Sequence, residues 1–221
     1  MRGFFVSGTG TEVGKTVVAA AIARTLAADG REVAVFKPAV TGLDEPGESD
    51  HALLRGAASS EQSDEEIAPY RYGPPMSPHL AAERAGEAID PSTLREAARR
   101  AASRADLLVC EGVGGLLVPL RASPRYLVRD LAIDLGLPLV VAASPGLGTI
   151  NHTLLTVETA RAAGLEVVAV VLTPWPDDPG PIEASNRETI ETLGEVRVET
   201  LPWLALGRPG SWPALPLPQP G

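Results

Sequence analysis

The chain has 221 residues, enough for one domain with a sizeable buried core. Apolar residues make up 44% and charged residues 21%, which excludes a chain that is disordered throughout, and the formal charge of −9 argues against nonspecific binding to nucleic acid or to an anionic membrane. The single cysteine, Cys110, excludes a disulfide framework and a cysteine-based zinc site, and it fits a reducing compartment.

Short apolar runs alternate with helix-like segments along most of the chain. The runs predict strands buried on both faces, near 2–7, 32–37, 106–110, 138–143, 166–172 and 196–201. Between them the pattern predicts helices over 15–28, 91–104, 127–135, 149–163 and 182–193. This alternation predicts an α/β fold, with a mostly parallel sheet and helices on both faces. Ligands of such sheets bind beyond the carboxyl ends of the strands.

Two stretches do not follow the alternation. Residues 42–90 carry scattered Gly, Pro, Ser and acidic residues, and we expect an extended excursion with short helices. Residues 207–221 include five prolines, so we expect a tail that lies on the surface or is disordered, after one domain over residues 1–206. The first apolar run is too short for a secretory signal and no run approaches a membrane span, so we expect a cytoplasmic protein.

The strongest motif is Gly8-Thr-Gly-Thr-Glu-Val-Gly-Lys-Thr16, which follows the first predicted strand and opens the first predicted helix. Glycines let backbone N–H groups converge on phosphates, and the helix N-terminus adds partial positive charge. Lys15 would reach the β- and γ-phosphates of a nucleotide, and the Thr16 hydroxyl would bind Mg²⁺. Position 9, where the usual spacing has glycine, is Thr9, so the motif is a variant P-loop and predicts a P-loop NTPase fold.

Charged residues stand at or near the ends of two other predicted strands. Glu111 begins the segment Glu-Gly-Val-Gly-Gly, and a carboxylate at this edge can face the phosphate loop and hold Mg²⁺. Lys37 ends the second strand, and because lysine is rarely buried without a partner, we expect an anion to meet it. Asp50 begins a predicted helix, where by itself an acid would stabilise the helix dipole.

These motifs resemble those of the dethiobiotin synthetases, a family of P-loop ligases in biotin synthesis. The resemblance spans roughly residues 3 to 204 and rests on the phosphate loop together with Lys37-Pro-Ala-Val-Thr-Gly42, Ser49-Asp50, Glu111-Gly-Val-Gly-Gly115, Leu147-Gly-Thr-Ile-Asn-His152 and Pro202-Trp-Leu204. It implies an ATP-dependent carbon–nitrogen ligase that uses Mg²⁺. The family closes a cyclic urea on 7,8-diaminononanoate with CO₂ and ATP, through a carbamate and a carbamic–phosphoric anhydride.

The resemblance also implies a role for each matching position. Lys37 and Lys15 would be catalytic, and Thr16, Asp50 and Glu111 would bind the metal. The diamine would contact Thr11, Lys37, Thr41 and Asn151. The nucleotide would contact Glu12, Val13, Gly14, Lys15, Thr16, Val17, Asp50, Glu111, Gly112, Val113, Gly114, Thr173, Leu201, Pro202 and Trp203. The family further implies a homodimer in which the helix start around Asn151 binds the carboxylate tail of the partner's substrate.

Thr173 departs from the family pattern. The family often has an asparagine there that recognises adenine, and threonine lacks the paired donor and acceptor of an amide, so the base preference stays open. Two further polar positions, His51 and Asn186, carry no clear signal and are predicted to lie on exposed or partly exposed helix surfaces.

Three other functions compete with the ligase. An amidoligase of the cobyric acid synthetase type would need a glutaminase domain with a catalytic cysteine, whereas Cys110 lies inside a predicted strand. A partitioning or positioning ATPase usually begins its loop with Lys-Gly-Gly, which is absent here. A nucleotide sensor without turnover would not need the substrate contacts that Lys37 and Thr41 imply.

Overall fold

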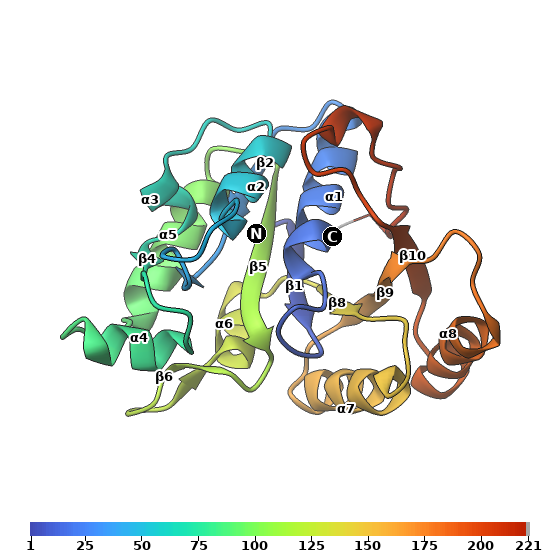
Figure 1. The fold of residues 1–221 in the computed structure, drawn as a ribbon. Coiled ribbons are helices and arrows are strands. Elements are labelled where there is room, and N and C mark those ends of the chain that lie inside the picture. Colours follow the sequence, from blue (N-terminus) through green and yellow to red (C-terminus); the bar gives the residue numbers. More distant parts are fainter. Residues whose placement is uncertain (220–221) are drawn as a thin grey trace.

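The computed structural model describes residues 1–219, so the last two residues of the predicted tail lie outside it. The core of this part of the chain is a six-stranded parallel sheet with the strand order β10-β9-β8-β1-β5-β2 (Figure 1). Its strands are β1 (Gly3–Gly8), β2 (Val33–Phe36), β5 (Leu107–Gly115), β8 (Leu139–Ala143), β9 (Val167–Trp175) and β10 (Val198–Pro202). The predicted α/β class is confirmed.

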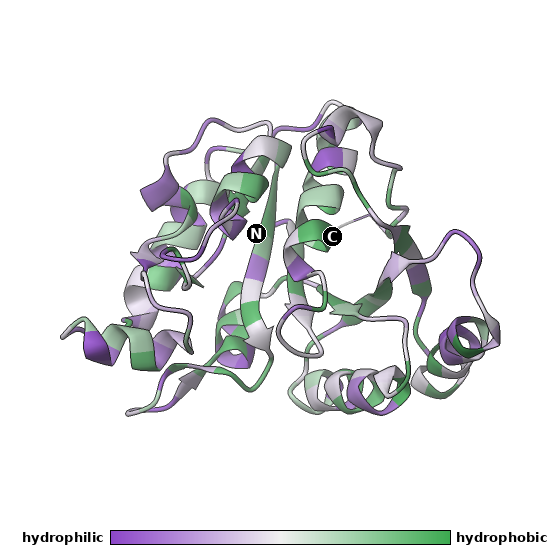
Figure 2. Ribbon diagram, in the orientation of Figure 1, coloured by the Kyte–Doolittle hydropathy of each residue, from purple (hydrophilic) through white to green (hydrophobic). Residues whose placement is uncertain are grey.

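Helices cover both faces of this sheet. Two lie on one face, α1 (Lys15–Ala28) and α2 (Asp50–Ala57), and four on the other, α5 (Pro91–Ala102), α6 (Val128–Leu135), α7 (Thr149–Ala162) and α8 (Pro181–Gly194). Figure 2 shows the apolar strands between these layers and the polar outer surfaces of α7 and α8. Sheets with two covered faces have strands that are apolar almost throughout, and β1 is buried at all six positions.

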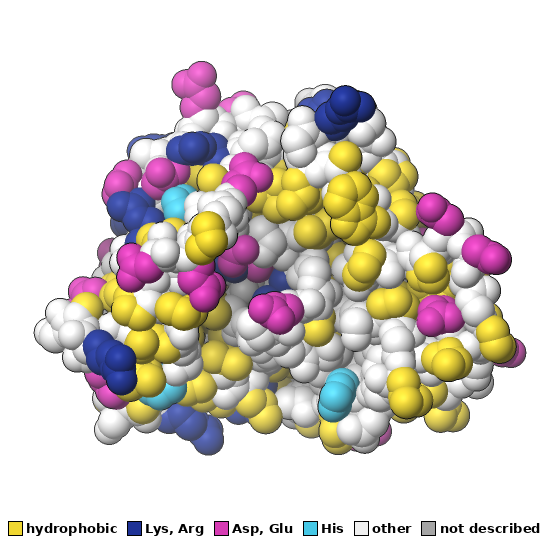
Figure 3. Space-filling model, in the orientation of Figure 1, with side chains coloured by type: hydrophobic (Ala, Val, Ile, Leu, Met, Phe, Trp, Pro, Cys, Tyr) yellow, Lys and Arg dark blue, Asp and Glu magenta, His cyan; other side chains and the backbone are white. Residues whose placement is uncertain are grey.

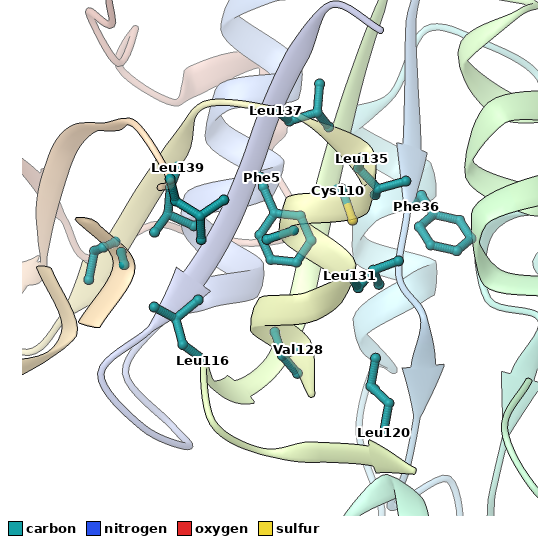
Figure 4. Packing of buried hydrophobic residues seen from close by; sticks show 14 of the residues in the cluster. Phe5, Phe36, Cys110, Leu116, Leu120, Val128, Leu131, Leu135, Leu137 and Leu139 are labelled. Carbon is teal, nitrogen blue, oxygen red and sulfur yellow. The ribbon is translucent and has the colours of Figure 1, made fainter. Parts of the chain in front are cut away.

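Neighbouring residues of β1 build opposite sides of the core. Phe4 packs with Val109 toward α1, whereas Phe5 packs with Cys110 and Leu131 toward α6, because successive side chains of a strand point to opposite faces. Figure 4 shows Phe5 among the apolar side chains of the second cluster, with Leu139 beside it. The two clusters pack on opposite faces of the sheet and hold its strands in place. The carboxyl ends of these parallel strands meet at one edge of the sheet.

The predicted strands and helices are confirmed with small shifts at their ends. The two longest strands extend beyond prediction, to Gly115 in β5 and Trp175 in β9. In each case a register shift lets the pairing continue, so that Gly8 still pairs with Gly115 and Pro202 with Trp175. Both extensions lie at the carboxyl edge of the sheet, where the loops that follow the strands begin.

The excursion over 42–90 contains short helices, as predicted. It holds α2, α3 (Asp64–Ile67) and α4 (Pro78–Arg84), and its strand β4 (Tyr70–Arg71) pairs with β3 (Ala39–Val40) just after Lys37. A second small pair, β6 (Pro119–Arg121) with β7 (Tyr126–Leu127), follows β5. The sequence analysis missed these two-stranded pairs, since strands of two or three residues leave no readable alternation.

The predictions that His51 and Asn186 lie on exposed or partly exposed helix surfaces are wrong. His51 is only 6% exposed because α2 lies across α1, and its Nε2 atom is 3.8 Å from Asp64 Oδ2. Asn186 is also 6% exposed, because α8 packs beside α7 and turns this side chain toward the loop after β8.

The described part of the tail lies on the surface against α1, with Leu215 inserted into the core. Among residues 1–219, the helices are too short or too polar to cross a membrane.

Candidate active site

The phosphate loop connects β1 to α1 and depends on glycine for its shape. Gly14 has φ 82°, a left-handed conformation that glycine adopts without strain. A Cβ atom at this position would lie 2.5 Å from Cγ2 of Thr173, so a larger residue does not fit. Thr173, which is 2% exposed, thus packs against the loop near the end of β9.

The side chain of Lys15 folds back onto the phosphate loop. Its Nζ atom donates a hydrogen bond to the carbonyl oxygen of Gly10, 2.7 Å away, and the side chain is mostly buried. Burial lowers the pKa of Lys15, and the negative charge of Glu111 offsets only part of that effect. An ammonium group held this way would exchange the carbonyl for phosphate oxygens when a nucleotide binds.

Thr16, Lys37, Asp50 and Glu111 form one cluster beside Lys15. The hydroxyl of Thr16 lies 3.0 Å from Asp50 Oδ1 and 2.9 Å from Glu111 Oε1. Lys37 Nζ lies 2.8 Å from Asp50 Oδ2 and 2.6 Å from Glu111 Oε1. Residues from α1, from α2, from the middle of β5 and from just after β2 therefore meet in a cluster of alternating charge.

Burial and pairing shift the pKa values of this cluster. Burial alone would lower the pKa of Lys37, but Glu111 and Asp50 outweigh it and raise that pKa. Burial would raise the pKa of Asp50, yet attraction to Lys37 lowers it overall. For Glu111 burial prevails over Lys37 and raises the pKa. Within the described chain the Oε2 atom of Glu111 has no hydrogen-bond partner, and such a buried oxygen can ligate a cation.

These side chains open into a cleft of about 850 Å³. Figure 3 shows acidic side chains around the hollow at the centre of this face. The structure brings twelve of the residues predicted for the site together along its wall: Thr11, Glu12, Gly14, Lys15, Thr16, Val17, Lys37, Thr41, Asp50, Glu111, Val113 and Gly114. Its volume lies in the range of small-molecule binding clefts.

Seven predicted residues lie outside that wall: Val13, Gly112, Asn151, Thr173, Leu201, Pro202 and Trp203. Leu201 points into the core and is 1% exposed, whereas Trp203 is 74% exposed. Asn151 is exposed in the first turn of α7. Such residues could contact ligands through their backbones or across an interface, but their side chains do not line this cleft.

The cleft also contains residues that the sequence analysis missed. Leu53 and Leu206 form part of its apolar wall, from α2 and from the segment after β10. Met76 and Ser77 come from the excursion, just before α4. No pattern in these segments marks them as site residues, since their place depends on how the excursion and the C-terminal segment fold back.

Three features define the class of protein. A glycine-rich loop joins a strand to a helix, and the first lysine of that helix folds back onto the loop. The next residue, a threonine, places its hydroxyl beside two carboxylates. This is a P-loop nucleotide-binding protein.

Comparison with known proteins narrows the class. The chain matches the family model described as "AAA domain" over residues 2–206. It is 43% identical over 205 residues to the ATP-dependent dethiobiotin synthetase BioD of Anaeromyxobacter dehalogenans (strain 2CP-1), covering 92% of this chain and 91% of that protein. It is 41% identical over 211 residues to the enzyme of that name from Rhodococcus erythropolis, covering 94% and 88%. The chain therefore belongs to the dethiobiotin synthetase family and is an ATP-dependent ligase.

Solved structures agree on the fold. The cell division ATPase MinD of Pyrococcus furiosus matches with a TM-score of 0.52 at 18% identity, covering 91% of this chain and 84% of that one. The signal recognition particle 54 kDa protein of Aeropyrum pernix, crystallised with GDP, also gives 0.52, at 15% identity, with 92% and 42% covered. At these identities the likeness shows a shared P-loop fold.

Proposed function

We propose that this ligase forms the ureido ring of dethiobiotin from 7,8-diaminononanoate, CO₂ and ATP. The observation that carries the proposal is the pairing of Lys37 with Asp50 and Glu111 on the wall of the cleft that contains Lys15 and Thr16. The phosphate loop serves nucleotide binding in any P-loop protein, whereas a second buried lysine in the same cleft suits the stabilisation of a phosphoryl group that passes to a bound acceptor.

The reaction would begin at the end of the cleft lined by Thr11, Thr41 and Lys37. One amine of the diamine adds to CO₂ and loses a proton, giving a carbamate. A carbamate oxygen attacks the γ-phosphorus, ADP leaves, and a carbamic–phosphoric anhydride forms. The second amine then attacks the carbonyl carbon, expels phosphate and loses a proton. The ring is thus closed without a covalent bond to the protein.

Positive charge would be the main contribution of the protein to phosphoryl transfer. Negative charge spreads over the transferred group and the leaving phosphate, and fixed cations stabilise it. Lys15 would hold the β- and γ-phosphates. Lys37, which remains protonated because its pKa is raised, would stabilise the carbamate and the transferred phosphoryl group.

Thr16, Asp50 and Glu111 would hold Mg²⁺. The hydroxyl of Thr16 lies within 3.0 Å of one oxygen of each carboxylate, and the unpartnered Oε2 of Glu111 adds a further oxygen ligand. Mg²⁺ favours such oxygen ligands and usually binds one or two carboxylates together with water and substrate phosphates. When bound, the ion would neutralise charge on the β- and γ-phosphates.

The base of the nucleotide would lie near the ends of β9 and β10, by Thr173 and the Leu201-Pro202-Trp203 segment. The side chain of Thr173 packs against Gly14, and its single hydroxyl offers no amide-like pair of contacts. We therefore propose that this enzyme discriminates weakly between ATP and other nucleoside triphosphates.

A second copy of the chain would complete the substrate site. Leu117 and Leu155 are 56% and 54% exposed and line a groove between the loop after β5 and α7. Leu147, in the loop before α7, is 95% exposed. Thr9 of the phosphate loop also lines this groove, so a partner seated there would lie next to the active site. Such a homodimer would bring the exposed Asn151 toward the partner's substrate.

The dimer is tested with Leu155→Glu, which places a charge in the apolar groove. Analytical ultracentrifugation should show a dimer for the wild type and a monomer for the variant, with loss of diamine turnover. Leu193→Glu is the matched control, since Leu193 is 66% exposed on α8. A monomeric wild type that turns over the diamine would exclude the shared site.

The function itself is tested by phosphate release. The purified protein is mixed with 7,8-diaminononanoate, bicarbonate and Mg²⁺, and ATP, CTP and GTP are compared in parallel. Release that requires the diamine is expected, with little difference between the three nucleotides. Release without the diamine would support a switch ATPase, and absence of release would support a sensor.

A further inference from the structure

The segment after β10 reaches the active-site cleft through one side chain. Leu204 is buried in the core beside α1 and is 5% exposed, whereas Leu206 is 39% exposed and lines the cleft. Val17 of α1 and Leu53 of α2 also contribute apolar surface to the wall of the cleft. The segment is thus anchored in the core by Leu204 and contributes Leu206, two positions later, to the wall of the cleft.

Trp212 forms a hydrogen bond that holds the segment after β10 in place. Its indole N–H donates to the carbonyl oxygen of Ala205, 3.0 Å away, and Ala205 is the residue just before Leu206. The same carbonyl accepts a hydrogen bond from the backbone N–H of Arg208, at 2.9 Å. A short 3₁₀ turn, Pro209–Ser211, connects these two contacts. The position of Leu206 thus depends on a residue six positions later.

Leu215 anchors the tail on α1. It is 2% exposed, and its backbone N–H donates to the hydroxyl of Thr25 at 3.0 Å. That hydroxyl in turn donates to the carbonyl of Ala21, 2.8 Å away, so its direction is fixed. Figure 1 shows the C-terminal segment running from β10 across the end of α1, and Figure 3 shows apolar side chains gathered over it.

We propose that Trp212 and Leu215 are positioning residues that hold Leu206 against the nucleoside of the bound nucleotide. The inference rests on the proposed placement of the nucleotide. Phosphates would lie at Lys15 and Thr16, and the diamine toward Thr11 and Thr41, so the nucleoside would lie where Leu206 joins the wall of the cleft.

An apolar wall suits the flat face of a base or the carbon face of a ribose, because removing such surfaces from water is favourable. A segment already fixed in the free protein loses little conformational freedom on binding. The proline-rich tail, which contributes no side chain to the cleft among its described residues, would act through this pre-organisation.

The test compares Mg²⁺·ATP with Mg²⁺·tripolyphosphate by isothermal titration calorimetry, in the full-length protein. Trp212→Phe retains an aromatic ring but removes the N–H donor, and Leu215→Ala removes the anchor. We expect each variant to bind ATP about three- to tenfold more weakly, the range that one lost hydrogen bond or partial loss of anchoring gives. Tripolyphosphate, which has no nucleoside, should bind within about twofold of the wild type.

Val168→Ala is the matched control, because Val168 packs against the same core at the opposite end of β9. It lowers stability without touching the segment, so both affinities should remain unchanged. Unchanged ATP affinity in both tail variants, or an equal loss for both ligands, would overturn the inference. The proposed reaction and this inference can fail separately. If ATP binding depends on the tail but phosphate release does not require the diamine, the proposed reaction is wrong and the inference holds.

Discussion

The ammonium group of Lys37 and the carboxylate of Glu111 meet at 2.6 Å, with the Lys37 side chain 3% exposed and the Glu111 side chain fully buried. The pairing of β2 with β5 explains the contact, because Phe36 and Cys110 are register partners and the two charged residues each follow by one position. Burying two charges costs several kcal/mol per ion, so each charge needs its partner. A strand register therefore places the proposed catalytic cation beside a proposed metal ligand.

Lys37→Ala should lower turnover on the order of 100-fold or more, because a preorganised charge at the transferred group is lost. Lys37→Gln keeps most of the length and removes the charge, so it should be similarly impaired. Steady-state phosphate release in the presence of the diamine measures both, and circular dichroism checks that the fold survives. Near-wild-type turnover in either variant would exclude the catalytic role.

Glu111→Gln should strongly reduce stabilisation by Mg²⁺. In the wild type, Mg²⁺ with ATP is expected to raise the melting temperature, since a ligand that binds only the folded state stabilises it. The variant loses the charged ligand and should respond far less to the ion. Glu61→Gln, on an exposed loop, is the control and should behave like the wild type. An undiminished Mg²⁺ response in Glu111→Gln would place the metal elsewhere.

The same residue makes a prediction about pH. Burial raises the pKa of Glu111 above its ordinary value of 4.5, so the folded protein retains a proton there that the unfolded chain has lost. Stability from this group is thus lost as pH rises from 4.5 through the folded-state pKa. Without metal, Glu111→Gln should gain stability relative to the wild type across that interval. A difference in melting temperature that is constant with pH would contradict this expectation.

Asp50 has the opposite dependence. Burial raises its pKa, but Lys37 prevails and holds it below 3.8, so its contribution to stability is present above that value and is lost as pH falls through the folded-state pKa. Asp50→Asn should therefore flatten the acid limb of the curve of melting temperature against pH. An unchanged acid limb would show that the ion pair with Lys37 contributes nothing to folding.

Asn186→Ala should destabilise the fold by about 1–3 kcal/mol, because a polar pairing at a largely buried site is lost. The amide of Asn186 donates to the carbonyl oxygens of Pro145 and Gly146, at 2.8 and 3.0 Å, and both bonds would be lost, although the Gly146 oxygen still accepts from the backbone N–H of Thr149 at 3.3 Å. Urea unfolding measures the change, with Glu188→Ala on the exposed side of α8 as the control. Equal midpoints for the two variants would contradict the prediction.

The sequence predicted the layered fold because its signals are local. The apolar runs of the strands, the helix periodicity and the loop from Gly8 to Thr16 each lie within a short stretch of chain. Resemblance added Thr41 and Asp50, which carry no readable signal by themselves. Both line the cleft, although their predicted roles stay predictions.

Residues placed by long-range packing could not be predicted in this way. Asn186 has the appearance of a surface residue until α8 docks on α7, and Leu206 is an ordinary loop leucine until the tail folds back over α1. The contact of Lys37 with Glu111 joins positions 74 residues apart in the chain. Local propensity and motif were enough to predict the six strands of the main sheet, five of the helices and the phosphate loop, because these signals lie within short stretches of chain. The pairing of the buried charges and the apolar side chains of the cleft follow from strand register and helix docking, which bring distant segments together.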